Sequence, residues 1–131
     1  GWTREINVQD STAYRKLQSL IAFMMSIPGV PVIYYGDEIG DSGGNDPDNR
    51  RMMRFDQLAE EEIATKSMVE KLVKLRRSNM ALLYGDWQVV KQTDQQVVIK
   101  RQYFNEQVWI AFNKSKEAVS ISLDGVPVQA T

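Results

Sequence analysis

Two groups of charged side chains between residues 37 and 50 have the types and spacing that carbohydrate chemistry uses. Asp37 and Glu38 are adjacent carboxylates, and Asp46 precedes Arg50 by four residues. Glycoside hydrolysis needs two carboxylates, which act as acid and base or as acid and nucleophile. A carboxylate held beside a guanidinium offers acceptors and donors that suit sugar hydroxyl groups. This segment is therefore the first candidate for a functional site.

The adjacent pair Asp37 and Glu38 is a poor candidate for catalysis. Neighbouring residues at the end of a strand point to opposite faces, whereas the carboxylates of a retaining glycosidase face one bond at a separation of about 5 Å. Carboxylates at the start of a loop commonly accept hydrogen bonds from backbone N–H groups. We therefore expect this pair to anchor the loop.

Chemistry alone leaves two interpretations open for Asp46 and Arg50, a sugar-binding pair or an internal ion pair that stiffens the loop.

The same segment begins like a calcium loop. An EF-hand counted from Asp46 would need an oxygen ligand at its fifth position, glycine at its sixth and glutamate at its twelfth. Arg50, Arg51 and Gln57 occupy those positions. We predict no metal and no cofactor here.

Two arginines and four aromatic side chains admit both a binding and a structural interpretation, and we favour the structural one for each. They are Arg51, Arg54, Tyr34, Tyr35, Trp87 and Trp109. The arginines could bind an anion, but a solvated loop charge is the commoner state. The rings could stack on sugar or starch, but rings on strands more often pack in a core or at its edge.

Composition narrows the class of protein. A chain of 131 residues can bury one core, or one small core and part of another. Its 16 basic and 17 acidic residues give a net charge of −1, so we expect no nucleic acid and no membrane as partner. Cysteine and histidine are absent, which excludes disulfides, thiol nucleophiles, histidine triads and the usual zinc sites. Localisation stays open.

Elements of an α/β protein must position the charged segment. Apolar residues at helical spacing predict a helix over 11–27, with Asp10 or Ser11 as its cap. The buried stripe of that helix is expected at Tyr14, Leu17, Ile21 and Met24. A β-branched and aromatic run predicts a buried strand over 30–35, and a long, turn-rich loop over 36–56 follows it. Helix, buried strand and loop form half of a β/α unit.

The second half of the chain changes from helical to alternating periodicity. A helix is predicted over 59–78, since acidic residues begin it and basic residues end it. Its buried side is expected at Ile63, Met68, Leu72 and Leu75. Antiparallel strands are expected over 97–103, 108–112 and 119–123, joined by short turns such as Thr93-Asp94-Gln95. We place a domain boundary between residues 79 and 84, which gives units 1–80 and 81–131.

The termini and the most apolar run complete these expectations. The run from Leu20 to Tyr35 is broken by Pro28, Gly29 and Pro31, so it predicts no membrane span. The first residues lack the basic start and apolar centre of a signal peptide, and no initiator methionine is present. We therefore expect the chain to begin inside a longer protein.

Two stretches carry a family resemblance. PGVPVIYYGDEIG, residues 28–40, followed by GNDPDNRR, residues 44–51, resembles the last barrel strand and loop of the α-amylase superfamily, glycoside hydrolase family 13. It is most similar to its neopullulanase, cyclomaltodextrinase and cyclodextrin-glucanotransferase members. KLRR, residues 74–77, with ALLYG, residues 81–85, resembles the passage from the last barrel helix into domain C.

The resemblance implies a fold: the last β/α elements of a (β/α)8 barrel, followed by most of a small antiparallel all-β domain C. It also implies that Asp46 and Arg50 contact glucosyl units. The family's catalytic carboxylates lie in R-x-D, E and N-H-D motifs on earlier strands, and no such motif occurs here. We therefore expect no catalytic residue in this chain and no activity from it alone.

The expected parent is a retaining hydrolase of α-1,4-glucans such as starch and maltooligosaccharides, with cyclodextrins as further candidate substrates. The parent could bind calcium elsewhere. The alternatives are a related α-glucanotransferase and a non-catalytic α-glucan-binding module built on Trp87, Trp109 and the Asp46 loop. Exposed barrel elements should also favour self-association of the isolated chain.

Overall fold

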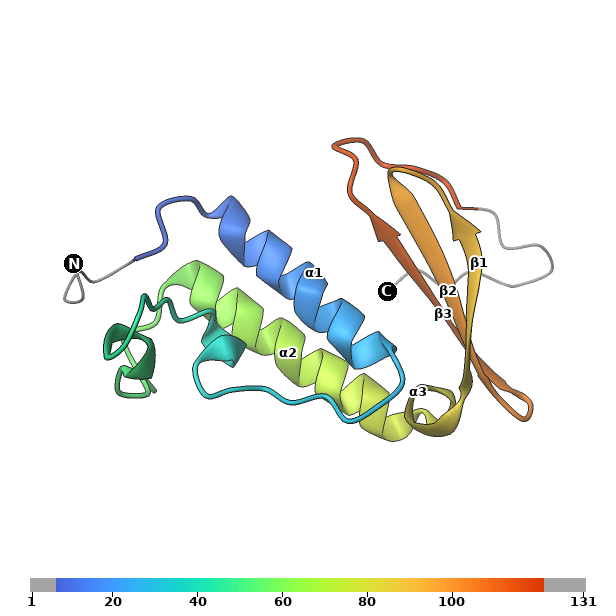
Figure 1. Ribbon diagram of the computed structural model, residues 1–131, viewed down its shortest axis with the longest axis horizontal. Coiled ribbons are helices and arrows are strands. Elements are labelled where there is room, and N and C mark those ends of the chain that lie inside the picture. Colours follow the sequence, from blue (N-terminus) through green and yellow to red (C-terminus); the bar gives the residue numbers. More distant parts are fainter. Residues whose placement is uncertain (1–6, 122–131) are drawn as a thin grey trace.

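The computed structural model describes residues 7–121, which form a pair of helices beside a three-stranded sheet (Figure 1). The helices are α1 (Thr12–Ser26), α2 (Glu60–Ser78) and the short α3 (Met80–Tyr84), and the strands are β1 (Asp86–Gln92), β2 (Gln96–Tyr103) and β3 (Glu106–Asn113). Two single 3-10 turns, η1 (Asp37–Ile39) and η2 (Asp48–Arg50), lie in the loop between α1 and α2. α1 and α2 run side by side in the same direction, and α3 leads into the sheet.

The predicted first helix is confirmed. Ile21 and Met25 are buried, and Leu17 and Met24 pack against the same cluster, as a 3.6-residue period requires. The Asp10 carboxylate accepts a hydrogen bond from the Thr12 N–H at 2.9 Å, so it satisfies a donor that the first turn leaves free. The Ser11 side chain makes no capping bond.

The predicted buried strand over 30–35 is wrong. The segment is extended but pairs with no strand among residues 7–121, whose sheet has the order β1-β2-β3. Val30 is 89% exposed and Val32 74% exposed, whereas Ile33 packs against the cluster between α1 and α2. A strand becomes buried only where neighbouring strands and helices cover it, and the described residues provide cover on one face alone.

The second helix is confirmed, but its predicted buried side is wrong in part. Ile63 and Leu75 are exposed. The buried positions are Glu62, Thr65, Val69 and Arg76. The Thr65 hydroxyl accepts a hydrogen bond from Gln18 at 3.0 Å and donates one to the Glu61 carbonyl at 2.7 Å. Polar residues thus occupy the buried face because they find partners there, which counting apolar residues cannot detect.

The structure confirms the antiparallel strands expected over 97–103 and 108–112 as β2 and β3. β2 pairs with β3 in unbroken register, with Val98 opposite Ala111. β1 was not among the expected strands. All of its residues are exposed, so it lacks the alternation of buried and exposed side chains that an apolar pattern would indicate. Of the predicted strand over 119–123, residues 119–121 are not a strand, and residues 122 and 123 lie outside the described residues.

Aromatic side chains join the sheet to α1. The Phe23 ring meets the rings of Trp87 and Phe112 edge-on, at centroid distances of 6.3 and 5.8 Å. Trp109 is half-buried, and the Lys100 ammonium lies 5.6 Å from the centroid of its ring. Both tryptophans therefore make packing contacts, in line with the favoured interpretation.

None of the helices in residues 7–121 has the length and apolarity that crossing a bilayer requires.

Candidate functional site

The loop between α1 and α2 brings Asp46 and Arg50 together. The Arg50 Nε lies 3.1 Å from the Asp46 Oδ1, and the side chains are 63% and 57% exposed, respectively. Arg50 ends the turn η2 and Asp46 lies two residues before that turn, and both side chains are on the surface of the loop. One N–H donor thus faces the carboxylate, while other donors of the guanidinium fork are open to solvent. Such a pair can exchange hydrogen bonds with a polyhydroxylated ligand.

Asp37 and Glu38 lie in the turn that opens the same loop. The Asp37 carboxylate accepts a hydrogen bond from the Tyr34 N–H at 3.1 Å, and the Glu38 carboxylate accepts one from the Gly36 N–H at 2.8 Å. Gly36 has φ +95°, a conformation that glycine adopts without steric cost. Both carboxylates face backbone donors within two or three residues along the chain, and these bonds close the turn.

Tyr34 and Tyr35 form an exposed aromatic pair, which contradicts their predicted place in a core. Their ring centroids lie 4.5 Å apart with planes inclined at 43°. A hydrogen bond with the Tyr34 hydroxyl raises the pKa of Tyr35. The rings are uncovered because the segment over 30–35 has no strand beside it. The alternative interpretation, a platform for an apolar sugar face, fits this exposure.

A hollow of about 340 Å³ separates the tyrosine pair from the η2 turn. Its lining includes Tyr34, Tyr35, Asp37, Asp48, Asn49 and Arg51. Arg51 is not the solvated charge that we expected, because its Nε and Nη2 atoms donate to the Asp48 carboxylate at 2.7 and 2.8 Å. The spacing of three residues between Asp48 and Arg51 is the sequence signal that indicates this pair.

Arg54 also departs from the expected solvated state. It donates to the Asp41 carboxylate at 3.0 Å and to the carboxylate of Glu62 in the first turn of α2. The Glu62 carboxylate in turn accepts a hydrogen bond from the Ala59 N–H at 2.8 Å, which caps the helix. Arg54 therefore ties the start of the loop to the start of α2, and its hydrogen bond lowers the pKa of Glu62.

This network predicts a loss of stability in acid. Because the folded state lowers the pKa of Glu62, its stabilising contribution is present above the ordinary value of 4.5 and is lost as pH falls through the lowered pKa. Glu62→Gln should therefore reduce the decline in unfolding free energy between about pH 6 and about pH 3, measured by urea titration. Glu60→Gln, an exposed residue in the same first turn of α2, is the control. An equal decline in both variants and the wild type would contradict the assignment.

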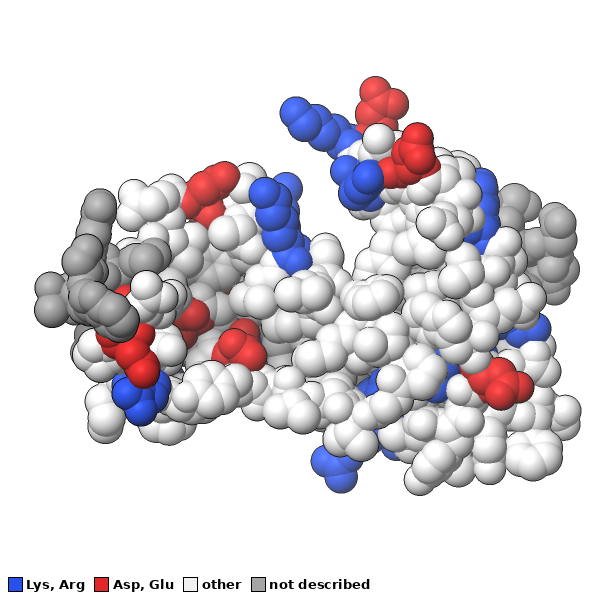
Figure 2. All heavy atoms as spheres, in the orientation of Figure 1, with Lys and Arg blue, Asp and Glu red and all other residues white. Residues whose placement is uncertain are grey.

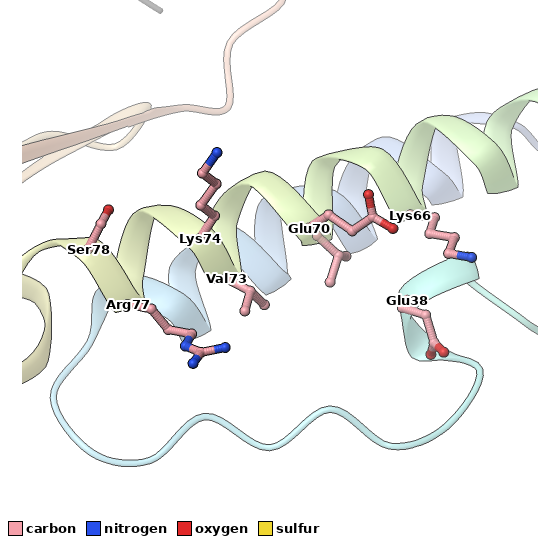
Figure 3. A pocket seen from close by; sticks show the side chains of 8 residues that line it. Glu38, Lys66, Glu70, Val73, Lys74, Arg77 and Ser78 are labelled. Carbon is pink, nitrogen blue, oxygen red and sulfur yellow. The ribbon is translucent and has the colours of Figure 1, made fainter.

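Two further hollows lie away from Asp46 and Arg50. One, of about 600 Å³, lies along α2, where charged side chains surround Val69 and Val73 (Figure 3). Its charged lining comprises Glu38, Lys66, Glu70, Lys74 and Arg77. The other, of about 1000 Å³, separates α1 from β3, and basic side chains lie on both of its sides (Figure 2). Within residues 7–121, no group of three or more acidic side chains is placed to hold a metal ion.

The chain is similar to proteins that act on α-glucans. It is 38% identical over 102 residues to a cyclomaltodextrin glucanotransferase from Bacillus sp. (strain 38-2), and the matched region covers 77% of this chain and 14% of that protein. It is 37% identical over 111 residues to a cyclomaltodextrinase from Geobacillus thermopakistaniensis (strain MAS1), which covers 83% of this chain and 19% of that protein. No protein-family model matches the chain.

The fold is likewise similar to solved structures. The α-amylase from Geobacillus thermoleovorans, complexed with acarbose, superposes with a TM-score of 0.71 at 36% identity. The match covers 79% of this chain and 22% of that one. The chain thus spans less than a quarter of the length of each of these relatives.

Proposed function

We propose, from the premise that this chain is a C-terminal part of a glycoside hydrolase of the α-amylase family, that its Asp46–Arg50 loop binds α-1,4-linked glucosyl units. The relatives of the chain include hydrolases and transferases that act on α-glucans. The exposed ion pair between Asp46 and Arg50 carries the proposal, because it holds a carboxylate and a guanidinium side by side while both remain more than half exposed and accessible to a ligand.

The surroundings of the pair support a sugar ligand over a charged one. The neighbouring hollow combines an exposed tyrosine pair with carboxylates that already have partners: Asp48 pairs with Arg51, Asp41 pairs with Arg54, and Asp37 accepts a hydrogen bond from the Tyr34 N–H. An aromatic face with polar groups at its rim suits a pyranose ring, which has an apolar face and a hydroxylated edge. In this proposal Asp37 and Glu38 hold the turn that presents Tyr34 and Tyr35.

The proposed architecture divides the chain into 1–80, the end of a (β/α)8 barrel, and 81–131, an antiparallel domain C. The extended segment over 30–35 would be the last barrel strand, and its exposed residues Val30 and Val32 would be covered by other parts of the parent. The same exposed face should favour self-association of the isolated chain, since an uncovered extended segment can pair with a second copy.

The parent would hydrolyse α-1,4-glucans with retention, using a carboxylate nucleophile and a carboxylic acid supplied from outside this chain. The chain itself would bind without reaction. A transferase differs only in that a sugar, and not water, accepts the glycosyl intermediate, and the glucanotransferases among the relatives keep this alternative open. Neither a metal nor a cofactor is part of the proposal.

Affinity electrophoresis of the 131-residue chain tests this function. Migration should slow in native gels that contain amylopectin and stay unchanged in gels with dextran, because the loop is proposed to select α-1,4 linkages. We expect weak binding, with a Kd on the order of 1 mM, since one small open site buries little surface. Incubation with soluble starch should release no reducing sugar. Equal migration in both gels would refute glucan binding, and sugar release would refute the absence of catalytic groups.

A further inference from the structure

Two buried arginines converge on the end of α1, where the extended segment that leads to the candidate site begins (Figure 1). Arg76 on α2 is 4% exposed and Arg101 on β2 is 1% exposed. No carboxylate of the described residues lies within ion-pair distance of either guanidinium. Buried cations without a counter-ion are uncommon, because leaving water is costly. Their position therefore calls for a physical explanation.

Backbone carbonyl groups take the place of the missing carboxylates. Arg76 donates to the carbonyls of Met25 at 2.5 Å, Ile27 at 3.0 Å and Gly29 at 2.6 Å. These oxygens lie at or just beyond the end of α1, where a helix leaves its last carbonyls unpaired and carries partial negative charge. The planar fork of arginine can reach three such acceptors at once.

Arg101 extends the same arrangement to the sheet. Its Nη1 donates to the Ser26 carbonyl at 2.6 Å, and its Nη2 donates to the Gly85 carbonyl at 2.9 Å. Its Nε lies 3.2 Å from the carbonyls of both Gly85 and Asp86. One side chain thus joins the end of α1 to the first residues of β1. Burial lowers the pKa of Arg101, and the Arg76 cation lowers it further.

The carbonyl of Gly29 makes this cluster relevant to the site. From residue 30 to residue 33 the backbone forms no hydrogen bond with any described residue. The extended segment is therefore held at two places, by Arg76 at Gly29 and by the buried contacts of Ile33. Tyr34 follows at once and begins the turn closed by Asp37. Arg76 thus fixes one end of the segment whose other end carries the tyrosine pair.

We propose that Arg76 and Arg101 are positioning residues that fix the tyrosine turn of the glucan site to α1 and the sheet. This inference rests on the proposed glucan binding for its functional consequence, although the mechanical link itself does not. The arginine cluster, defined as Arg76, Arg101 and the carbonyls they contact, makes the sheet a support for the loop. It explains why two cations are buried although no carboxylate of the described residues forms an ion pair with either of them.

Lysine substitutions in the full chain test the link, because lysine keeps the charge but cannot span several carbonyls with a planar fork. The readout is amide hydrogen exchange at Ile39, Gly40 and Asp41, whose N–H groups donate within the turn. In Arg76→Lys and Arg101→Lys these amides should exchange about tenfold faster or more, while the β2–β3 amides stay protected. Arg77→Lys, an exposed neighbour on α2, should leave all rates unchanged.

Unchanged turn exchange in folded lysine variants would overturn the proposal. A wild-type measurement covers the case in which a variant does not fold: the exchange of the Arg101 Nε proton and of the Asp41 amide should rise together as urea is added. An Asp41 amide that opens while the Arg101 proton stays protected would also overturn it. Retardation by amylopectin forms the separate functional arm, in which the folded lysine variants should bind several-fold more weakly. If amylopectin does not slow the migration of the wild-type chain, the glucan site is refuted, but the hydrogen-exchange test of the link between the arginines and the turn still applies.

Discussion

Arg50→Ala should weaken binding of amylopectin and maltohexaose by about tenfold to a hundredfold, because charge-assisted hydrogen bonds to hydroxyl groups each contribute about 1.5–3 kcal/mol. Asp46→Ala should have a comparable effect, since it removes an acceptor and releases Arg50 from its 3.1 Å contact. Arg50→Lys should bind with intermediate affinity, because lysine keeps the charge without the planar donors. Retardation in amylopectin gels measures all three.

The matched control for these variants is Asp94→Ala. Asp94 is exposed in the turn between β1 and β2, on the sheet and away from the loop. Its replacement removes the same charge as Asp46→Ala and should not alter retardation. If Asp94→Ala and Asp46→Ala weakened binding equally, a general charge effect would explain the result. If neither Asp46→Ala nor Arg50→Ala altered binding, the two residues would not form the site.

Gly85→Ala should destabilise the chain by about 3 kcal/mol or prevent folding, because added atoms in a packed position force the backbone apart. A Cβ at Gly85 would lie 2.3 Å from the Ala81 carbonyl oxygen and 2.7 Å from that of Gln102. Both are backbone atoms, so neither can turn aside. The Gly85 carbonyl also accepts hydrogen bonds from Arg101, which the shift would disturb. Urea unfolding followed by circular dichroism gives the change in free energy.

Gly29→Ala separates steric overlap from backbone strain. A Cβ at Gly29 would meet no atom within 4 Å, but its φ of +109° strains any other residue. We expect that variant to lose about 1–3 kcal/mol of unfolding free energy, the cost of an unfavourable backbone conformation alone.

A Gly85→Ala variant as stable as the wild type would contradict the close packing of the α3–β1 connection.

Local sequence patterns predicted the elements that depend on neighbours along the chain. The helices over 12–26 and 60–78 follow from apolar spacing and from the distribution of charge at their ends. The turn expected at Thr93-Asp94-Gln95 is present, although β1, the strand before it, was not among the expected strands. The contact between Asp46 and Arg50 could be anticipated because four residues of tight turn bring two such side chains within reach.

Features that depend on distant contacts could not be predicted in this way. Burial of a strand over 30–35 requires strands beside it, and the apolar residues alone do not supply them. Arg54 meets Asp41 and Glu62, which lie thirteen and eight residues away and approach only when the loop folds back on α2. The arginine cluster is more remote still, since Arg101 reaches a carbonyl 75 residues earlier in the chain. Because the cluster consists of arginine side chains and backbone carbonyls, no pattern of apolar residues in the sequence indicates it.

Amide chemical shifts of the labelled chain during a titration with maltohexaose test whether α-glucan binds at the loop between α1 and α2. Shifts are expected at residues 34–51, centred on Tyr34, Tyr35, Asp46 and Arg50, while the amides of the sheet stay unchanged. Cellohexaose, which has β linkages, should cause none of these shifts. Shifts centred on Trp87 and Trp109 would favour the glucan-binding module instead, and an unchanged spectrum at saturating maltohexaose would contradict the account.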